Sequence, residues 1–522
     1  MRGPILSTLA LALALGPTLA GVDDASWKTA LQNFEDDFKK KSVVFKHRAL
    51  EALPTTDERT ITFIIEQKKL LQDKNWWIRA AAAERLGRVQ VPELRTKVLA
   101  YAKHKDKMVR EGILCAVGQI KHRLDPPVIV EALQDKDWEV RRMACFAAGQ
   151  QRIKEAVPKM ISMIREVDSN GKVLQEGELN PRVHSVLLYN LEEIVGQYYH
   201  TDVQQWKQYW EANKEKTLPP PKRFDMGTFG GVSLDYNDTF ARRGTGPLVI
   251  VLPELNYSTL YYLPYFNQWL FVKWLFINLP PIRSFPGLTF DADNDPYYPV
   301  DILVDAFEDM RKKRNVEKMA ILAHGFTTWI AAKYAQKYPD RVLGLILLNP
   351  WGSNETYGKR LDELIRSDDP DEEFWAKVNR KQIRIANPQE GMQYEYISSS
   401  VRVRDQTDLE VSCLRGFWRD PEGTTVVVPE FDIRGDNTSR VPVLMYFENE
   451  ANRLQTTDDL KRMQRYYVDN ITVTCKKSAR LPFMEESEIF EKALRMFVEK
   501  KLNPAWEKAE QVAREAAAKA RN

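Results

Sequence analysis

The sequence is short of the residue types that carry most metal and covalent chemistry. Its 522 residues include four cysteines and six histidines, and no cysteine–histidine cluster has the spacing of a metal site. We therefore predict neither a metal nor a cofactor. Four cysteines are too few to stabilise a chain of this length by disulfides. Cys115 and Cys145 lie on apolar, helix-like faces and are interpreted as buried thiols, while the pattern leaves open whether any pair is bonded.

Strong net charge and long apolar runs are also missing. The 76 basic and 73 acidic side chains leave a formal net charge of +3, so the charge balance favours no nucleic-acid partner. Beyond the first twenty residues, no apolar run approaches the roughly 18 residues that a membrane-spanning helix needs. We therefore expect no transmembrane segment in the mature chain. The length itself predicts more than one domain.

The first twenty residues have the pattern of a secretory signal peptide. Arg2 precedes an apolar stretch at 5–15, and Thr18 and Ala20 are suited to cleavage before Gly21. We predict a signal peptide at 1–20 and an exported protein, periplasmic or extracellular. The alternative is that the segment is retained as an anchor.

A repeat fills the N-terminal part of the chain. Asp73–Gly87, His104–Gly118 and Asp135–Gly149 superimpose at a period of 31 residues, and each is followed by a second amphipathic run. Less regular copies flank them, and a polar insertion at 168–180 interrupts the series. Trp206 and Trp210, four residues apart, are expected to share a helix face that closes the last repeat.

These helix–turn–helix units resemble the HEAT repeat, and the resemblance implies a stacked helical solenoid over 21–216. Such an array offers a long surface for protein partners. Arg79, Arg110 and Arg141 recur at equivalent positions and suggest a basic ladder for binding. The interpretation that we favour is structural: these arginines bond aspartates and exposed helix ends between repeats.

A proline-rich segment at 217–222 predicts a linker, and a second domain is expected over 223–503. In that domain a strand-like run, Met319–Ala323, leads through His324-Gly325-Phe326-Thr327-Thr328 into a helix-like run, Trp329–Gln336. This order, and the following YPDRVLGLILLNP, resemble the nucleophile elbow of the α/β-hydrolases, where a serine stands at the centre of G-x-S-x-G. Gly325 occupies the place of that serine. A glycine keeps the positive-φ turn without strain and removes the nucleophile.

The same resemblance implies that the other catalytic positions are replaced. Matching 441–451 and 478–490 to the family places Ala451 where the acid belongs and Arg480 where the histidine belongs. An independent observation agrees: no histidine follows His324, although the fold orders its triad as Ser, acid, His. Arg480 cannot act as a base, because a guanidinium keeps its proton near neutral pH. We predict no catalytic residues in this domain.

The oxyanion turn of the family is altered as well. Pro253 and Glu254 follow the strand-like run 248–252; proline lacks an N–H, and a carboxylate repels a developing oxyanion. Thr327 and Thr328 are expected to cap the helix that follows, although the hydroxyls of Thr327, Thr328 and Ser258 and the carboxylates of Glu254 and Glu450 leave open an unorthodox hydrolysis. The candidate pocket comprises Pro253, Glu254, Ser258, His324, Phe326, Thr327 and Glu450.

Other segments of the second half have simpler interpretations. The aromatic run 261–275 is read as core rather than as a lipid or cofactor groove. A charged insertion at about 362–430 falls where the family carries a lid, and 504–522 is a charged tail, helical or disordered.

The sequence thus predicts a multidomain protein: an all-α HEAT-like solenoid followed by an α/β-hydrolase fold with a mostly parallel sheet and helices on both faces. The function predicted is that of a secreted or periplasmic non-catalytic binding or scaffold protein. It would act through protein partners on the array and through a small-molecule ligand in the vestigial pocket. The alternative is an atypical α/β-hydrolase acting on an ester, amide or peptide. The identities of ligand and partner and the oligomeric state are not encoded in any pattern that we recognise.

Overall fold

The computed structural model describes residues 22–39, 46, 49–168, 172–217, 225–253, 262–266, 268–279, 300–350, 439–447, 457–476 and 481–521. They fall into two compact units, Met1–Gln151 and Arg152–Asn522. The predicted signal peptide, most of the proline-rich linker and the insertion at 362–430 lie outside the described residues. The boundaries proposed from sequence therefore remain predictions.

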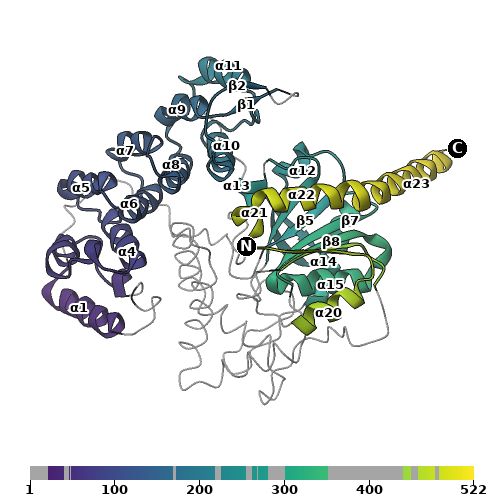
Figure 1. Ribbon diagram of the computed structural model, residues 1–522, viewed down its shortest axis with the longest axis horizontal. Helices are drawn as coiled ribbons and strands as arrows, with labels where there is room; N and C mark the ends of the chain where they lie inside the picture. Colours follow the sequence, from purple (N-terminus) through teal and green to yellow (C-terminus); the bar gives the residue numbers. More distant parts are fainter. Residues whose placement is uncertain are drawn as a thin grey trace, which may run out of the picture. The chain divides into compact units, whose positions relative to one another are not determined.

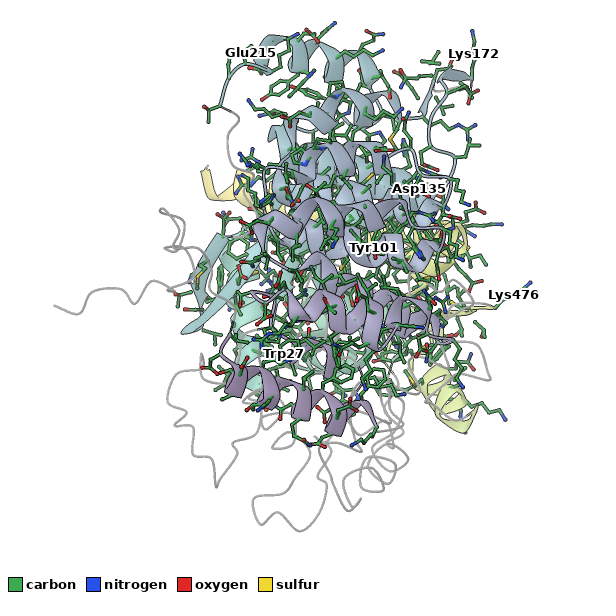
Figure 2. All side chains as sticks on the ribbon, turned by 90° about the vertical axis from the view of Figure 1, so that its left-hand side faces the viewer. Trp27, Tyr101, Asp135, Lys172, Glu215 and Lys476 are labelled. Atoms are coloured by element: carbon green, nitrogen blue, oxygen red, sulfur yellow. The ribbon has the colours of Figure 1, made fainter. Side chains whose placement is uncertain are left out.

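The first unit is a stack of short helices (Figure 1). The three predicted repeats are confirmed, because their first helices α4, α6 and α8 pack side by side in chain order. Figure 2 views the stack along another direction and shows Trp27, Tyr101 and Asp135 at progressively later levels of the stack. Its elements are α1 (Asp24–Phe38), α3 (Arg59–Thr62), η1 (Phe63–Gln67), η2 (Leu70–Gln72), α4 (Trp76–Gly87), α5 (Pro92–Leu99), η3 (Ala100–Lys103), α6 (Lys107–Gln119), α7 (Asp125–Ala132) and α8 (Trp138–Gln151).

Close contact between first helices explains the glycines of the repeat. A Cβ added to Gly87 would lie 2.6 Å from the Ala116 Cβ, and one on Gly118 would lie 3.0 Å from the Ala147 Cα. Only a residue without a side chain lets the backbones approach so closely. Cys115 and Cys145 are buried in this layer, as the sequence predicted.

The second unit begins with further short helices. Trp206 and Trp210 are both buried on α11, which confirms their shared face. Two short strands pair antiparallel at the start of the polar insertion, one just before it and one within it, and the sequence did not reveal them. The elements here are η4 (Lys154–Ala156), α9 (Val157–Ser162), β1 (Glu166–Val167), β2 (Val173–Gln175), α10 (Pro181–Val195) and α11 (Val203–Asn213).

An eight-stranded sheet forms the rest of this unit. Its order is β10-β9-β8-β7-β5-β6-β4-β3, in which β4 runs antiparallel to both of its neighbours, β3 and β6, and all other neighbouring strands pair in parallel. Counted from the first strand of the sheet, this is the order 1-2-4-3-5-6-7-8 of the α/β-hydrolase fold, and the predicted fold class is confirmed. The strands are β3 (Asp225–Phe229), β4 (Val232–Asn237), β5 (Leu248–Leu252), β6 (Lys273–Asn278), β7 (Met319–His324), β8 (Val342–Leu348), β9 (Val443–Phe447) and β10 (Asn470–Thr474).

Helices cover both faces of the sheet (Figure 1). On one face α14 and α15 bury a core with alternate strand residues such as Ile250 and Ile321. On the other face Phe490 of α22 packs on Tyr446 of β9. The helices are α12 (Thr239–Arg243), α13 (Leu263–Phe266), α14 (Val300–Lys313), η7 (Gly325–Thr327), α15 (Thr328–Lys337), η8 (Pro339–Arg341), α20 (Thr457–Tyr466), α21 (Pro482–Glu485), α22 (Ser487–Phe497), η9 (Val498–Leu502) and α23 (Asn503–Arg521). The described part of the C-terminal tail is thus helical.

Helix α10 packs directly on the sheet domain within this unit. It contacts α13, and the Ser185 hydroxyl donates a hydrogen bond to the Pro264 carbonyl. Nearby, Arg243 at the end of α12 donates to Glu192 of α10 at 2.7 Å. Helix α10 and the sheet domain therefore share a packed, charge-paired contact within one compact unit.

A buried carboxylate ties α14 to α15. Glu308 accepts two hydrogen bonds of 2.8 Å from Arg311 and one of 2.8 Å from the Tyr334 hydroxyl. Arg311 also donates to the carbonyls of Val316 and Glu317, just before β7. Burial opposes ionisation of Glu308, but the bonds from Arg311 and Tyr334 outweigh it and lower its pKa to about 2.

This lowered pKa predicts a pH-dependent contribution to stability. A carboxyl with a folded pKa near 2 and an ordinary value of 4.5 stabilises the fold above pH 4.5, and the contribution is lost as pH falls toward 2. We expect Glu308→Gln to lower the free energy of unfolding by about 2 kcal/mol at pH 7, and by less at pH 4.

Urea unfolding of both proteins between pH 7 and pH 3 measures this difference. The control is Glu488→Gln, which neutralises an exposed carboxylate on α22. A stability difference between wild type and Glu308→Gln that did not shrink with falling pH would contradict the assignment.

Candidate functional site

The strand-to-helix turn after β7 has the backbone geometry expected of an elbow. Gly325 has φ +57° and opens a single 3-10 turn, after which α15 begins at Thr328. A side chain at this φ would strain the backbone by about 1 kcal/mol or more. The turn therefore has the shape that presents a nucleophile in hydrolases, with a hydrogen atom in place of a side chain.

The imidazole of His324, one residue before the turn, is enclosed by protein. It is fully buried, and its Nδ1 lies 2.6 Å from the Tyr262 hydroxyl. Its Nε2 lies 3.5 Å from Nδ2 of Asn349, which follows β8 with φ +47°. Three segments thus meet at the carboxyl edge of the sheet, where open α/β sheets carry their sites. The contacts make His324 a centre of packing.

Thr327 holds the turn closed instead of capping the helix. Its hydroxyl accepts the His324 N–H at 2.9 Å and lies 3.0 Å from both the Leu252 and His324 carbonyls, to which it donates. The predicted capping role of Thr327 is wrong, because the side chain makes no cap bond to α15. The fully buried hydroxyl instead ties the end of β7 to the end of β5.

Thr328 makes a second short bond within the turn. Its hydroxyl donates to the Gly325 carbonyl at 2.6 Å, and the residue is 2% exposed. The two threonine hydroxyls considered for an unorthodox hydrolysis are therefore buried and bonded to backbone carbonyls. A nucleophile needs an accessible oxygen, and both of these hydroxyls are buried.

The remaining candidates divide into those described and those outside the description. Pro253 is buried directly after β5 and offers no N–H. Phe326 lies in the 3-10 turn, and its side chain is not described. Outside the described residues fall Glu254, Ser258, Glu450, Ala451 and Arg480, so their roles remain predictions.

Sequence reasoning missed two members of this cluster. Tyr262 lies in the aromatic run, which is core as predicted: Tyr262, Trp269 and Trp274 are all fully buried. The run gave no sign that one hydroxyl would reach His324. The position of Asn349 in the sequence could have indicated its role, because a polar residue directly after a parallel strand lies at the carboxyl edge of the sheet, where open α/β sheets bind their ligands.

The structural interpretation of the recurring arginines is confirmed for Arg79 and Arg110, which bond neighbouring repeats, while Arg141 donates to carbonyls of its own turn. Arg110 donates to Asp135 through Nε at 2.8 Å and Nη2 at 2.9 Å, and to the His104 carbonyl at 2.8 Å. Arg79 reaches Asp106 and the Asp73 carbonyl in the same way. Each guanidinium thus closes its own turn and joins the next repeat. These cations are committed to the fold.

Among the described residues, no group of three or more histidine, cysteine, aspartate or glutamate side chains is placed to hold a metal. In the same part of the chain, no helix is both long enough and apolar enough to cross a bilayer.

Comparison with known proteins agrees with both halves of the fold. Residues 67–133 match the family of HEAT repeats, and residues 127–150 match the HEAT repeat. Abhydrolase domain-containing protein lid-1 of Caenorhabditis elegans is 45% identical over 141 residues, which is 26% of this chain and 37% of the relative. Human 1-acylglycerol-3-phosphate O-acyltransferase ABHD5 is 35% identical over 81 residues, 14% of this chain and 23% of the relative. The chain thus spans well under half the length of these relatives.

The solved structures that resemble this chain include a thermophilic esterase from Thermogutta terrifontis. It shares 16% identity over 53% of this chain and 99% of its own, with a TM-score of 0.39. The family matches and the similarity to lid-1 together show that the chain combines HEAT repeats with a region that has α/β-hydrolase-like relatives.

The Thr327 hydroxyl provides a test of the turn. Thr327→Val keeps the shape and removes the hydroxyl, leaving the buried His324 N–H and Leu252 carbonyl without this partner. We expect a loss of about 2 kcal/mol in the free energy of unfolding. Thr327→Ser keeps the hydroxyl and is expected to cost less. Urea unfolding compares the two, and a larger loss for the serine variant would show that the methyl group, not the hydroxyl, stabilises the turn.

Proposed function

We propose that this chain is a non-catalytic binding protein, in which a HEAT-like array engages protein partners and an α/β-hydrolase-like domain serves as a folded module without turnover. We further propose that it is exported to a periplasm or the cell exterior, on the pattern of residues 1–20. A small-molecule ligand in the vestigial pocket belongs to the same proposal.

The observation that carries the proposal is the turn at Gly325. The position that presents a nucleophile in hydrolases has no side chain, and the two neighbouring hydroxyls are buried and bonded to backbone. The adjacent imidazole is held between Tyr262 and Asn349. Every polar side chain described at the turn is thus engaged within the fold.

The sequence adds a second, independent support. No histidine follows His324, so the usual base of this fold has no candidate downstream of the elbow. Ala451 and Arg480, matched by resemblance to the acid and base positions, extend the same argument.

The alternative is an atypical hydrolase or acyl-transferring enzyme. It is favoured by the partial similarity to ABHD5, whose name states an acyltransferase activity on 1-acylglycerol-3-phosphate. It requires a nucleophile from a segment other than the turn, such as the one carrying Ser258.

Labelling with a fluorophosphonate probe, together with turnover of p-nitrophenyl butyrate, distinguishes the two. We expect neither labelling nor turnover in the purified full-length chain. We expect none in Gly325→Ser either, because a restored hydroxyl still has no downstream histidine to deprotonate it.

A positive result would be traced with two variants. Labelling abolished by Thr327→Ala or by Ser258→Ala would overturn the proposal and identify the nucleophile. A serine hydrolase labelled in parallel shows that the probe is active.

A further inference from the structure

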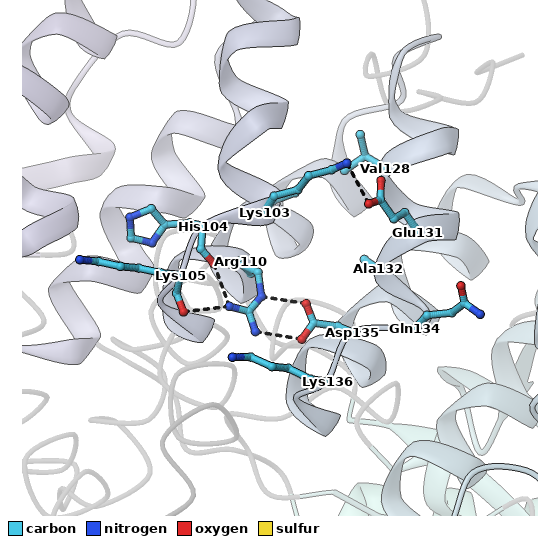
Figure 3. A pocket seen from close by; sticks show the side chains of 11 residues that line it. Lys103, His104, Lys105, Arg110, Val128, Glu131, Ala132, Gln134, Asp135 and Lys136 are labelled. Carbon is cyan, nitrogen blue, oxygen red and sulfur yellow. Dashed lines mark hydrogen bonds and ion pairs between the residues drawn. The ribbon is translucent and has the colours of Figure 1, made fainter.

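A pocket of about 550 Å³ lies between the second and third regular repeats, in the first unit. It is framed by the end of η3, the start of α6, the end of α7 and the turn before α8 (Figure 3). Its charged lining comprises Lys103, Lys105, Arg110, Lys136, Glu131 and Asp135. Cations outnumber anions by four to two, although the chain as a whole is nearly neutral.

Two of these cations are committed within the pocket. Arg110 forms the two-bond pair with Asp135, and Lys103 pairs with Glu131 at 2.8 Å, as the dashed lines of Figure 3 show. Lys105 and Lys136 are exposed and form no ion pair with any residue that the structure describes. These two ammonium groups are the pocket's available positive charges.

His104 adds a hydrogen-bond donor beside them. Its Nδ1 accepts the Asp106 N–H at 3.2 Å, so in the neutral ring Nε2 carries the hydrogen. The available groups are thus two ammoniums and one imidazole N–H, a set that suits carboxylate oxygens.

The spacing of the lysines follows the repeat. Lys105 and Lys136 occupy equivalent turns of adjacent repeats, which packed helices place about 8–10 Å apart. Alternate side chains of an extended peptide are about 7 Å apart, and flexible lysine stems cover the difference. Lys74, also exposed, occupies the equivalent turn one repeat earlier. A linear ligand with acidic side chains on one edge matches this row.

Acid side chains interspersed in the row favour a peptide over a uniform polyanion. Asp73, Asp106 and Asp137 lie beside the lysines in these turns, and Glu131 stands in the pocket itself. Asp106, Asp137 and Glu131 already pair with Arg79, Arg110 and Lys103. The row therefore offers isolated lysine charges, which match separated carboxylates better than the continuous charge of a nucleic acid or an anionic bilayer.

We propose that this pocket binds an acidic peptide segment of a protein partner, with Lys105 and Lys136 pairing its carboxylates and His104 donating a third bond. The proposal rests on the binding role proposed above and names the site and the chemistry of the partner.

Fluorescence anisotropy with a fluorescein-labelled peptide of alternating Glu and Ser, on the full-length chain, tests the site. We expect it to bind at least about tenfold more tightly than a peptide with Gln in place of Glu, with weaker binding at higher salt. Lys105→Glu/Lys136→Glu should weaken binding of the Glu peptide at least about tenfold. The matched control, Lys97→Glu/Lys121→Glu, makes the same charge change at exposed lysines that do not line the pocket and should leave binding unchanged.

Several results would overturn the site. They are equal affinity for the Glu and Gln peptides, equal losses in the two double variants, or tighter binding of single-stranded RNA or phosphatidylserine vesicles. Lys105→Gln/Lys136→Gln replaces the double glutamate variant if circular dichroism shows that the latter is misfolded. The two proposals fail independently. Labelling by the fluorophosphonate probe would overturn the non-catalytic function and leave the peptide affinity unchanged. Absence of peptide binding would overturn the pocket and would not produce turnover.

Discussion

The hydroxyl of Thr327 is the interaction on which the carboxyl edge of the sheet depends. It links the last peptide of β7 to the Leu252 carbonyl of β5, two central neighbours in the sheet. With that link in place, the backbone turns sharply at Gly325 and α15 starts within three residues. The arrangement keeps the outline of a catalytic elbow while using its polar groups for cohesion. Interior bonds of this kind are costly to break, because each buried partner would be left unsolvated.

The helical repeats are also held together by side chains that bond to backbone carbonyls. Arg79 and Arg110 each bond carbonyls of their own turn and an aspartate of the next repeat, so that loops and stacking are stabilised by the same side chain. Guanidinium groups bonded in this way are not available to pair with a ligand. In the binding site proposed above, recognition falls to the lysines of the same turns, which carry charge on long, exposed stems. The two cation types divide these tasks in accordance with their chemistry.

Much of the architecture could be predicted from periodicity alone. The 31-residue repeat located α4, α6 and α8, and the strand-like runs at 248–252 and 319–323 located β5 and β7. The turn at Gly325 was placed by its resemblance to an elbow. What could not be predicted depends on tertiary packing: the Tyr262–His324 bond, the inward direction of the Thr327 hydroxyl, and the strand pair at the start of the insertion. Local sequence does not state which distant carbonyl a side chain will meet.

The contact between α10 and α13 has a practical consequence for dissecting the protein. Separating the halves in the proline-rich segment would leave Pro264 and Arg243 on one fragment and their partners Ser185 and Glu192 on the other. The freed surfaces would include apolar area that normally avoids water, and recombinant halves cut there would be prone to aggregate. A cut near 151, between the two compact units, leaves this seam whole.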